Sequence, residues 1–167
     1  KADDIQVIDF DGEPVEGDLL PSVETLMHVA AYRARPDIGA FVHTHSVYAS
    51  VLAVARLELP PLIDEIVASV GGGVRVAEYS FPSTEELADN VAAALDGRNA
   101  ALLANHGLVG VGKDLRKALA ICEMVERAAH IYVMARALDR VNLLPEEVIA
   151  IEQDLFRMTH PTEAPNT

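Results

Sequence analysis

The 167-residue sequence lacks the features that mark secreted and membrane proteins. It has a single cysteine, Cys122, so no internal disulfide can form and nothing indicates an oxidising compartment. It shows no signal-peptide pattern and no apolar run long enough to cross a bilayer. We therefore expect a cytoplasmic protein that does not act in a membrane.

Basic residues are also scarce. The chain has 13 lysines and arginines against 26 aspartates and glutamates, which gives a formal net charge of -13, and no basic cluster interrupts this balance. Nucleic acid and anionic membranes are poor partners for such a surface. A phosphorylated small molecule stays compatible with it, because a local pocket can oppose the global charge.

Hydrophobic residues, by contrast, make up 50% of the chain, which is typical of one globular domain with a sizeable core. We predict a single domain over residues 1–159 and a mobile tail over residues 160–167, where two prolines occur without an apolar anchor. The sequence begins at Lys1 rather than at a methionine. We therefore expect that a segment before Lys1 is missing from it.

Strand and helix patterns alternate along the chain without repeats or an internal linker. We expect Ser22 to cap the first helix, and Ser83 with Glu86 forms the pattern of a capping box. This alternation predicts one α/β domain in which helices cover a sheet. The patterns indicate strands over residues 5–10, 38–45, 74–76, 100–104 and 108–111, and helices over residues 22–35, 47–56, 83–95, 115–133 and 145–158.

The strongest chemical signal is the pair His43 and His45 at the end of an apolar strand pattern. Side chains two residues apart in a strand point to the same face, so both imidazoles can approach one point. His106, in the sequence Ala-Asn-His-Gly between two predicted strands, offers a third imidazole. Three imidazoles suit a divalent transition metal, usually zinc, with one coordination position open. The alternative is that His43 and His45 are hydrogen-bonded core residues and that His106 is a turn residue.

Glu24 is the candidate for acid–base chemistry. It stands in the first turn of a predicted helix, where the exposed N–H groups and the helix dipole favour a negative charge. An ionised carboxylate there can act as a base near neutral pH. The alternative is structural, since acidic residues are common at helix starts for stability alone.

Taken together, these segments resemble the class II aldolase/adducin family. Pro-Ser-Val-Glu at residues 21–24, His-Thr-His-Ser at residues 43–46 and Ala-Asn-His-Gly at residues 104–107 look like its ordered motifs. The resemblance covers residues 21 to about 137. It implies a three-layer α/β/α fold with a central mixed, mostly antiparallel sheet. It also implies a homotetramer with active sites at the subunit interfaces.

The resemblance assigns the metal to His43, His45 and His106 and the acid–base role to Glu24. It implies one zinc ion per chain, with another divalent metal such as manganese as an alternative. The implied reaction is a retro-aldol cleavage of a small ketose phosphate, in which the zinc stabilises an enediolate. Glu24 would then move a proton to or from the carbon at which the bond breaks.

Three departures from the family pattern leave the substrate open. Val23 stands where the family's sugar-phosphate aldolases have a second serine, so Ser22 is the serine left there to hold phosphate. In the family, further phosphate contacts come from an N-terminal part that is absent here, which agrees with the expected missing segment before Lys1. A tyrosine that a neighbouring subunit lends to the site is replaced here by Glu65 or a residue near it, which makes Glu65 a second candidate for substrate binding.

Two other functions stay open at this stage. A decarboxylase of a 3-oxo or aromatic acid in the same family would use the same metal to stabilise an enolate. An adducin-like binding module would keep the fold without chemistry. The complete set of three histidines argues against the module.

Overall fold

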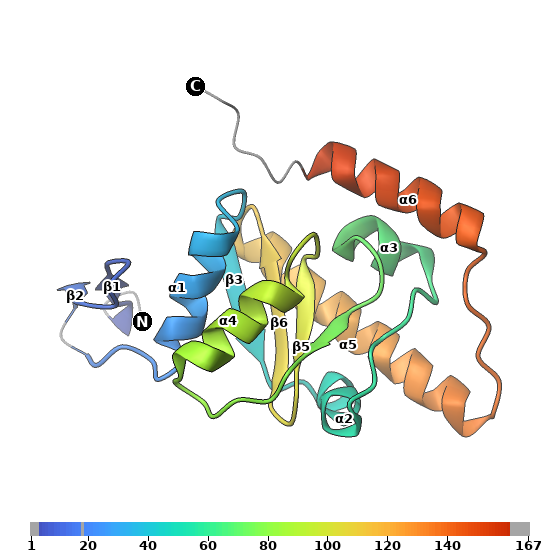
Figure 1. The fold of residues 1–167 in the computed structure, drawn as a ribbon, viewed down its shortest axis with the longest axis horizontal. Coiled ribbons are helices and arrows are strands. Elements are labelled where there is room, and N and C mark those ends of the chain that lie inside the picture. Colours follow the sequence, from blue (N-terminus) through green and yellow to red (C-terminus); the bar gives the residue numbers. More distant parts are fainter. Residues whose placement is uncertain (1–3, 18, 161–167) are drawn as a thin grey trace.

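A four-stranded sheet forms the centre of the molecule (Figure 1). A computed structural model describes residues 4–17 and 19–160 of the chain. β6 pairs in antiparallel fashion with both of its neighbours, whereas β4 and β5 are parallel. The predicted mixed, mostly antiparallel sheet is therefore confirmed. The strands lie in the order β3-β6-β5-β4, with bounds β3 Ala40–Thr44, β4 Arg75–Ala77, β5 Ala100–Leu103 and β6 Gly107–Gly112.

Helices cover both faces of this sheet (Figure 1). One layer holds α1 and α4, and the other holds α2, α3 and α5, with α6 packed on α3. This arrangement confirms the expected three-layer α/β/α fold. The bounds are α1 Thr25–Ala34, α2 Val47–Ala55, α3 Asp64–Val70, α4 Glu85–Ala94, α5 Leu115–Ala137 and α6 Glu146–Thr159.

The strand β5 shows why the sequence pattern is apolar at every position. Ala100 and Leu102 belong to the hydrophobic cluster under α2 and α5, whereas Ala101 and Leu103 belong to the cluster under α1 and α4. All four side chains are fully buried. Because successive residues of a strand face opposite sides and helices cover both, no position of β5 is left for a polar residue.

The long helix α5 lies close against β6. A Cβ atom on Gly110 would lie 2.7 Å from Cys122 Sγ and 2.9 Å from Ala118 O, so only glycine allows this contact. Cys122 is buried, and burial raises the pKa of its thiol to about 11. The thiol is therefore a packing group of the core at neutral pH.

The N-terminal strand is shorter than predicted. β1 (Val7–Ile8) pairs with β2 (Pro14–Glu16) in a separate two-stranded sheet, whereas the pattern indicated a strand over residues 5–10. The Asp9 carboxylate accepts hydrogen bonds from the backbone N–H groups of Asp11 and Glu13, both at 2.9 Å. These local bonds start the turn at Asp9 and end the strand early.

Two helices begin at other residues than predicted. α1 begins at Thr25 with Glu24 at its N-cap, and Ser22 Oγ accepts a hydrogen bond from Glu24 N before the helix starts. α4 is capped by Thr84, whose Oγ1 accepts a hydrogen bond from Leu87 N. The predicted capping box is wrong because Ser83 has a φ of +66°, whereas an N-cap residue has an extended backbone.

A buried arginine joins the C-terminal ends of α1 and α4. The Arg35 side chain donates hydrogen bonds to both carboxylate oxygens of Asp37 at 2.7 Å. It also donates to Leu95 O, Arg98 O and Asn99 Oδ1. Arg35 and Asn99 are only 5% and 3% exposed, so these bonds satisfy a charge and an amide that water cannot reach.

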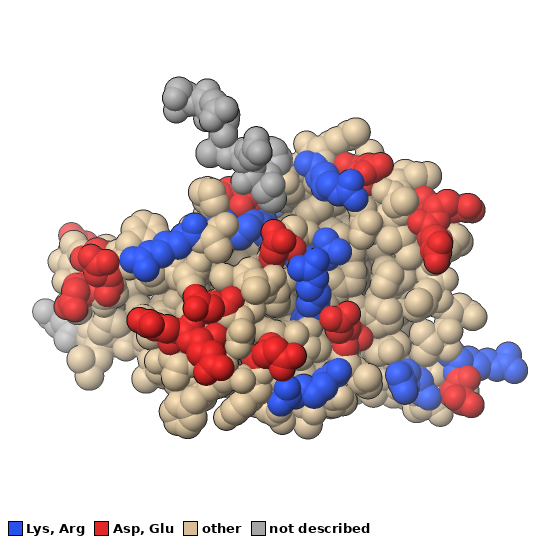
Figure 2. Space-filling view, viewed as in Figure 1, with Lys and Arg blue, Asp and Glu red and all other residues tan. Residues whose placement is uncertain are grey.

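Figure 2 shows acidic and basic side chains interspersed over the face formed by α1 and α4, without a continuous basic patch on that face. Across residues 4–17 and 19–160, no helix is both long and apolar enough to cross a membrane. His160 follows the last turn of α6 as its C-cap residue and stacks on Phe156 at a ring distance of 4.3 Å. The rest of the predicted mobile tail, residues 161–167, lies outside the described residues.

Candidate metal centre

Two of the three predicted ligands lie at the end of β3. His43 is the fourth residue of the strand and His45 follows its last residue. The Nε2 atoms of the two rings are 2.9 Å apart, and the ring centroids are 4.8 Å apart. The extended backbone from His43 to His45 therefore presents both imidazoles to one point, as the spacing of two residues predicted.

His106 reaches the same point from the turn between β5 and β6. Its ring centroid lies 4.8 Å from that of His43 and 5.0 Å from that of His45. The turn depends on Asn105, whose φ is +57°, and on Gly107. A Cβ atom on Gly107 would lie 2.5 Å from Thr44 O and 3.2 Å from His43 Cε1, so glycine is required for β6 to pair beside the histidines.

The electrostatics of His43 suit a ligand. Its Nδ1–H donates a hydrogen bond to Leu108 O at 3.0 Å, which leaves the Nε2 lone pair directed at the other two histidines. Burial, together with the neighbouring His106, lowers the pKa of His43 to about 4. The ring is therefore neutral at neutral pH, which is the form that binds metal.

The three histidines fit a transition-metal ion. One ligand atom from each of His43, His45 and His106 lies within 4.8 Å of the other two. Three imidazoles from two separate segments, without a fourth protein ligand in the cluster, are the donor set of a zinc site with an open position.

Glu24 lies beside this cluster. Its Oε1 is 3.6 Å from His106 Nε2, and its side chain is 17% exposed. Its Oε2 is buried and has no hydrogen-bond partner among the described residues. Such an oxygen is costly to leave without a partner, so the position indicates that a cation or a substrate proton meets it there. The sequence pattern placed Glu24 in the first turn of this helix. In the structure it is instead the N-cap residue of α1.

Ser22 stands at the edge of a cavity of about 390 Å³ between α1 and the β1–β2 sheet. His28 and Tyr32 of α1 also line this cavity. Ser22 Oγ accepts a hydrogen bond from Glu24 N at 3.2 Å, so its own O–H remains able to donate. Ser22 is therefore joined to Glu24 by the backbone and faces a space that a small anion could enter.

Glu65 lies apart from the three histidines. It is in the first turn of α3 and forms an ion pair with Arg127 of α5 at 3.2 Å, where both side chains are more than half exposed. It is not part of the histidine cluster. Within one chain, the structure thus brings His43, His45, His106 and Glu24 together and leaves Glu65 on the surface.

The sequence analysis did not identify Glu126 of α5 as a residue of the site. Its two carboxylate oxygens accept hydrogen bonds from Tyr48 N at 2.9 Å and Ala49 N at 2.8 Å, in the first turn of α2. That helix starts two residues after His45, so Glu126 holds the backbone beside a candidate ligand. The signal available was its position next to Val125, at the edge of the apolar stripe of the helix.

Comparison with known proteins agrees with this geometry. The family model "Class II Aldolase and Adducin N-terminal domain" matches residues 1–133. The chain is 40% identical over 147 residues to a 5-deoxy-D-ribulose 1-phosphate aldolase of Bacillus thuringiensis, covering 88% of this chain and 68% of that protein. It is 38% identical over 154 residues to an L-fuculose phosphate aldolase of Escherichia coli, covering 92% and 71% respectively.

Solved structures give the same result. A structure of an L-fuculose 1-phosphate aldolase superposes with a TM-score of 0.89 at 43% identity, covering 94% of this chain and 74% of that one. These similarities confirm the predicted class II aldolase-type lyase. They also agree with the three-histidine cluster, since metal dependence belongs to that class of aldolase. The chain thus belongs to the class II aldolase and adducin N-terminal domain family.

Proposed function

We propose that this protein is a zinc-dependent lyase that cleaves a small ketose phosphate by retro-aldol chemistry. The observation that carries the proposal is the convergence of His43, His45 and His106 with an unpartnered carboxylate oxygen of Glu24 beside them. The relatives named as aldolases of deoxyribulose phosphate and fuculose phosphate support the substrate class.

The three histidines would hold the ion through one ring nitrogen each. A zinc ion there, or manganese as the alternative, supplies a Lewis acid that stabilises negative charge developing on substrate oxygens. The residues contribute neutral donors, and Leu108 O orients the ring of His43 by accepting its Nδ1–H. Gly107 keeps the backbone close enough for His106 to complete the set.

Glu24 would handle the proton. In the cleavage direction the hydroxyl on the departing carbon would lose its proton to solvent water and become the aldehyde carbonyl, while the carbon–carbon bond breaks and its electron pair stays on the ketone fragment. The carbon that keeps this pair must then receive a proton, and the carboxyl of Glu24 would deliver it. Because Glu24 Oε2 has no hydrogen-bond donor among the described residues, it is available for this exchange.

Two further residues would contact substrate. The Ser22 hydroxyl, whose oxygen already accepts from Glu24 N, would donate to a phosphate oxygen. Glu65 lies on the surface of the single chain, so it would reach substrate only in the site of a neighbouring copy. We propose a homotetramer with active sites at the interfaces for that reason, and the cytoplasmic location stays a prediction.

The test is an activity assay of the purified protein on ketose phosphates and on 3-oxo acids, with aldehyde and carbon dioxide both measured. Aldehyde release from a ketose phosphate supports the proposal. Carbon dioxide release without cleavage of any ketose phosphate would identify the decarboxylase instead. Protein that binds no divalent ion and turns over neither class would identify a binding module of the adducin kind.

A further inference from the structure

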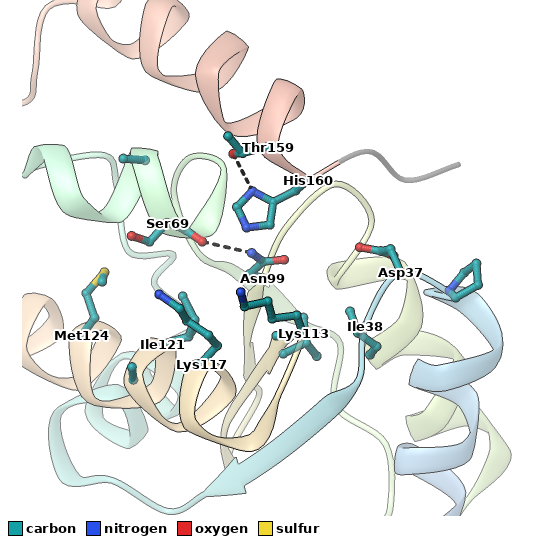
Figure 3. A pocket seen from close by; sticks show the side chains of 15 residues that line it. Asp37, Ile38, Ser69, Asn99, Lys113, Lys117, Ile121, Met124, Thr159 and His160 are labelled. Atoms are coloured by element: carbon teal, nitrogen blue, oxygen red, sulfur yellow. Dashed lines mark hydrogen bonds between the residues drawn. The ribbon is translucent and has the colours of Figure 1, made fainter. Parts of the chain in front are cut away.

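A second cavity lies at the end of the sheet opposite the histidines (Figure 3). Its volume is about 600 Å³, within the range of roughly 300–1,000 Å³ that is usual for small-molecule sites. Its walls come from the segment before β3, the end of β6, the first turns of α5 and the ends of α3 and α6.

This cavity is separate from the metal centre. Ile38 and Gly112 line it, and Gly112 pairs with Ala40 at the start of β3. The histidines lie at the other end of the same strands, where His43 pairs with Val109. His43 lies five positions after Ile38, which corresponds to about 16 Å along an extended backbone. A ligand in this cavity could not touch the metal ligands.

The charge of the cavity is opposite to that of the molecule. The whole chain has only three lysines, and two of them, Lys113 and Lys117, line this one cavity. Figure 3 shows both side chains at the cavity, with Lys113 extending toward Asn99 and Lys117 beside Ile121. In the described part of the chain, neither lysine forms an ion pair. On a protein with a net charge of -13, two such amino groups at one cavity indicate an anion site.

The carboxylates of Asp37 and Asp114, near the cavity, already have hydrogen-bond partners. Both oxygens of Asp37 accept hydrogen bonds from the buried Arg35. Asp114 caps α5 and accepts from Lys117 N at 2.8 Å. Each carboxylate thus has a structural partner other than a lysine amino group. The positive end of the 23-residue helix α5 adds to the attraction for an anion.

The remaining lining defines the rest of the ligand. Ile38, Val111, Ile121 and Met124 form an apolar wall. Asn99 and Ser69 close one side of the cavity, where Asn99 Nδ2 donates to Ser69 O at 3.1 Å (Figure 3). The ligand must therefore combine an anionic group near the two lysines with an apolar body along α5.

We propose that this cavity binds a small organic anion, a phosphate monoester or a carboxylate with an apolar substituent, through Lys113 and Lys117. The site is independent of the proposed reaction at the histidines. It would be filled whether or not the protein cleaves a ketose phosphate.

Phenyl phosphate is a suitable probe, because it has one dianionic group and one apolar ring. We would titrate it into the zinc-loaded full chain and follow backbone amides by two-dimensional NMR. The expected result is saturable shifts at Ile38, Asn99 and residues 111–117. Replacing both lysines in Lys113→Met/Lys117→Met should weaken this binding by about tenfold or more, since both charge-assisted contacts are lost.

Two control variants distinguish the effect of positive charge inside the cavity from the effect of the net charge of the protein. Arg116→Met removes the same charge from the neighbouring position, outside the cavity lining, and should leave the affinity within about threefold. Lys113→Arg/Lys117→Arg keeps the charge and should retain binding. Shifts confined to residues beside His43, His45 and His106 would overturn the proposal, because the probe would then bind only at the metal centre. Equal weakening by Arg116→Met, or no saturable shift, would also overturn it.

Discussion

At the scale of single residues, the site depends on four side chains with separate tasks. Three imidazoles present ring nitrogens to one point, and Glu24 offers a carboxylate oxygen that has no hydrogen-bond donor among the described residues. Such a division means that metal binding and proton transfer should be separable by mutation.

Glu24→Gln is expected to keep the metal but to lower kcat by about 10²- to 10⁴-fold, because an amide cannot exchange the proton. Turnover and bound metal are measured on the same preparation. Glu123→Gln makes the same chemical change on an exposed side chain of α5 and should keep activity close to that of the wild type. Rates like those of the wild type in Glu24→Gln would remove Glu24 from the mechanism.

His106→Ala is expected to lose both the metal and the activity, because only two imidazoles remain. Elemental analysis after dialysis without added metal measures the loss. His130→Ala is the matched control, since His130 stacks on Tyr48 away from the cluster and its variant should retain one ion per chain. Tight retention of one ion by His106→Ala would contradict the ligand assignment.

At the scale of secondary-structure elements, two contacts hold the frame around the site. One is the Glu126 carboxylate at the start of α2, and the other is the Arg35–Asp37 pair between α1 and β3. The Glu126 carboxylate joins α5 to α2, which is far from it in the sequence. The Arg35–Asp37 pair fixes the chain where it enters β3, the strand that carries His43.

Glu126→Ala should weaken metal binding, because α2 loses two N–H acceptors directly after His45. The loss of such a cap also costs about 1 kcal/mol in the free energy of unfolding. Metal affinity by competition with a chelator is the readout that distinguishes positioning from stability. Glu126→Gln keeps one acceptor oxygen and should be intermediate, and Glu123→Ala, an exposed residue of the same helix, should behave like the wild type. Unchanged metal affinity in Glu126→Ala would refute the positioning role.

Asp37 makes the free energy of unfolding depend on pH in the acid range. Hydrogen bonds from Arg35 lower the pKa of Asp37 below its ordinary value. Its contribution is therefore fully present above about pH 4 and is lost as the pH falls through the lower pKa of the folded state. Asp37→Asn should cost about 2 kcal/mol at pH 7 and should flatten the decline in acid. Urea unfolding between pH 7 and pH 3 measures both.

The matched control for this pair is Asp154→Asn. Asp154 also pairs with an arginine at 2.7 Å, but both side chains are more than 60% exposed. Its loss should change the free energy of unfolding by only a few tenths of a kcal/mol. A similar cost for both variants would mean that burial does not strengthen the Arg35–Asp37 pair.

At the scale of the whole molecule, the proposed tetramer allows a test by mixing. If Glu65 serves the site of a neighbouring copy, each site takes Glu24 from one chain and Glu65 from the next. Glu24→Gln and Glu65→Gln tetramers should each be impaired. Hybrids formed from an equal mixture should recover about a quarter of the wild-type activity, because a quarter of their sites contain neither change. Sedimentation velocity checks the assembly, and no recovery in confirmed hybrids would place Glu65 outside the site.

Much of the architecture could be predicted from the amino-acid sequence. The alternation of strand and helix patterns indicated the α/β domain, and the patterns at residues 100–104 and 108–111 correctly indicated the strands β5 and β6. The errors lie where local hydrogen bonds or backbone conformation override the pattern, as at Asp9 and at Ser83. The spacing of His43 and His45 predicted their shared face, because that geometry depends only on a local extended backbone.

Contacts between distant elements were decided only in the folded molecule. His106 meets the other histidines because β6 pairs with β3, and Gly107 allows that approach. Glu126 reaches α2, and Lys113 and Lys117 face one cavity, because α5 packs across the sheet. The local sequence sets the backbone preference of each segment and the spacing of its buried side chains. Packing of the core decides which surfaces of the helices and strands come into contact. The candidate metal centre and the proposed anion site both lie where such separate elements meet.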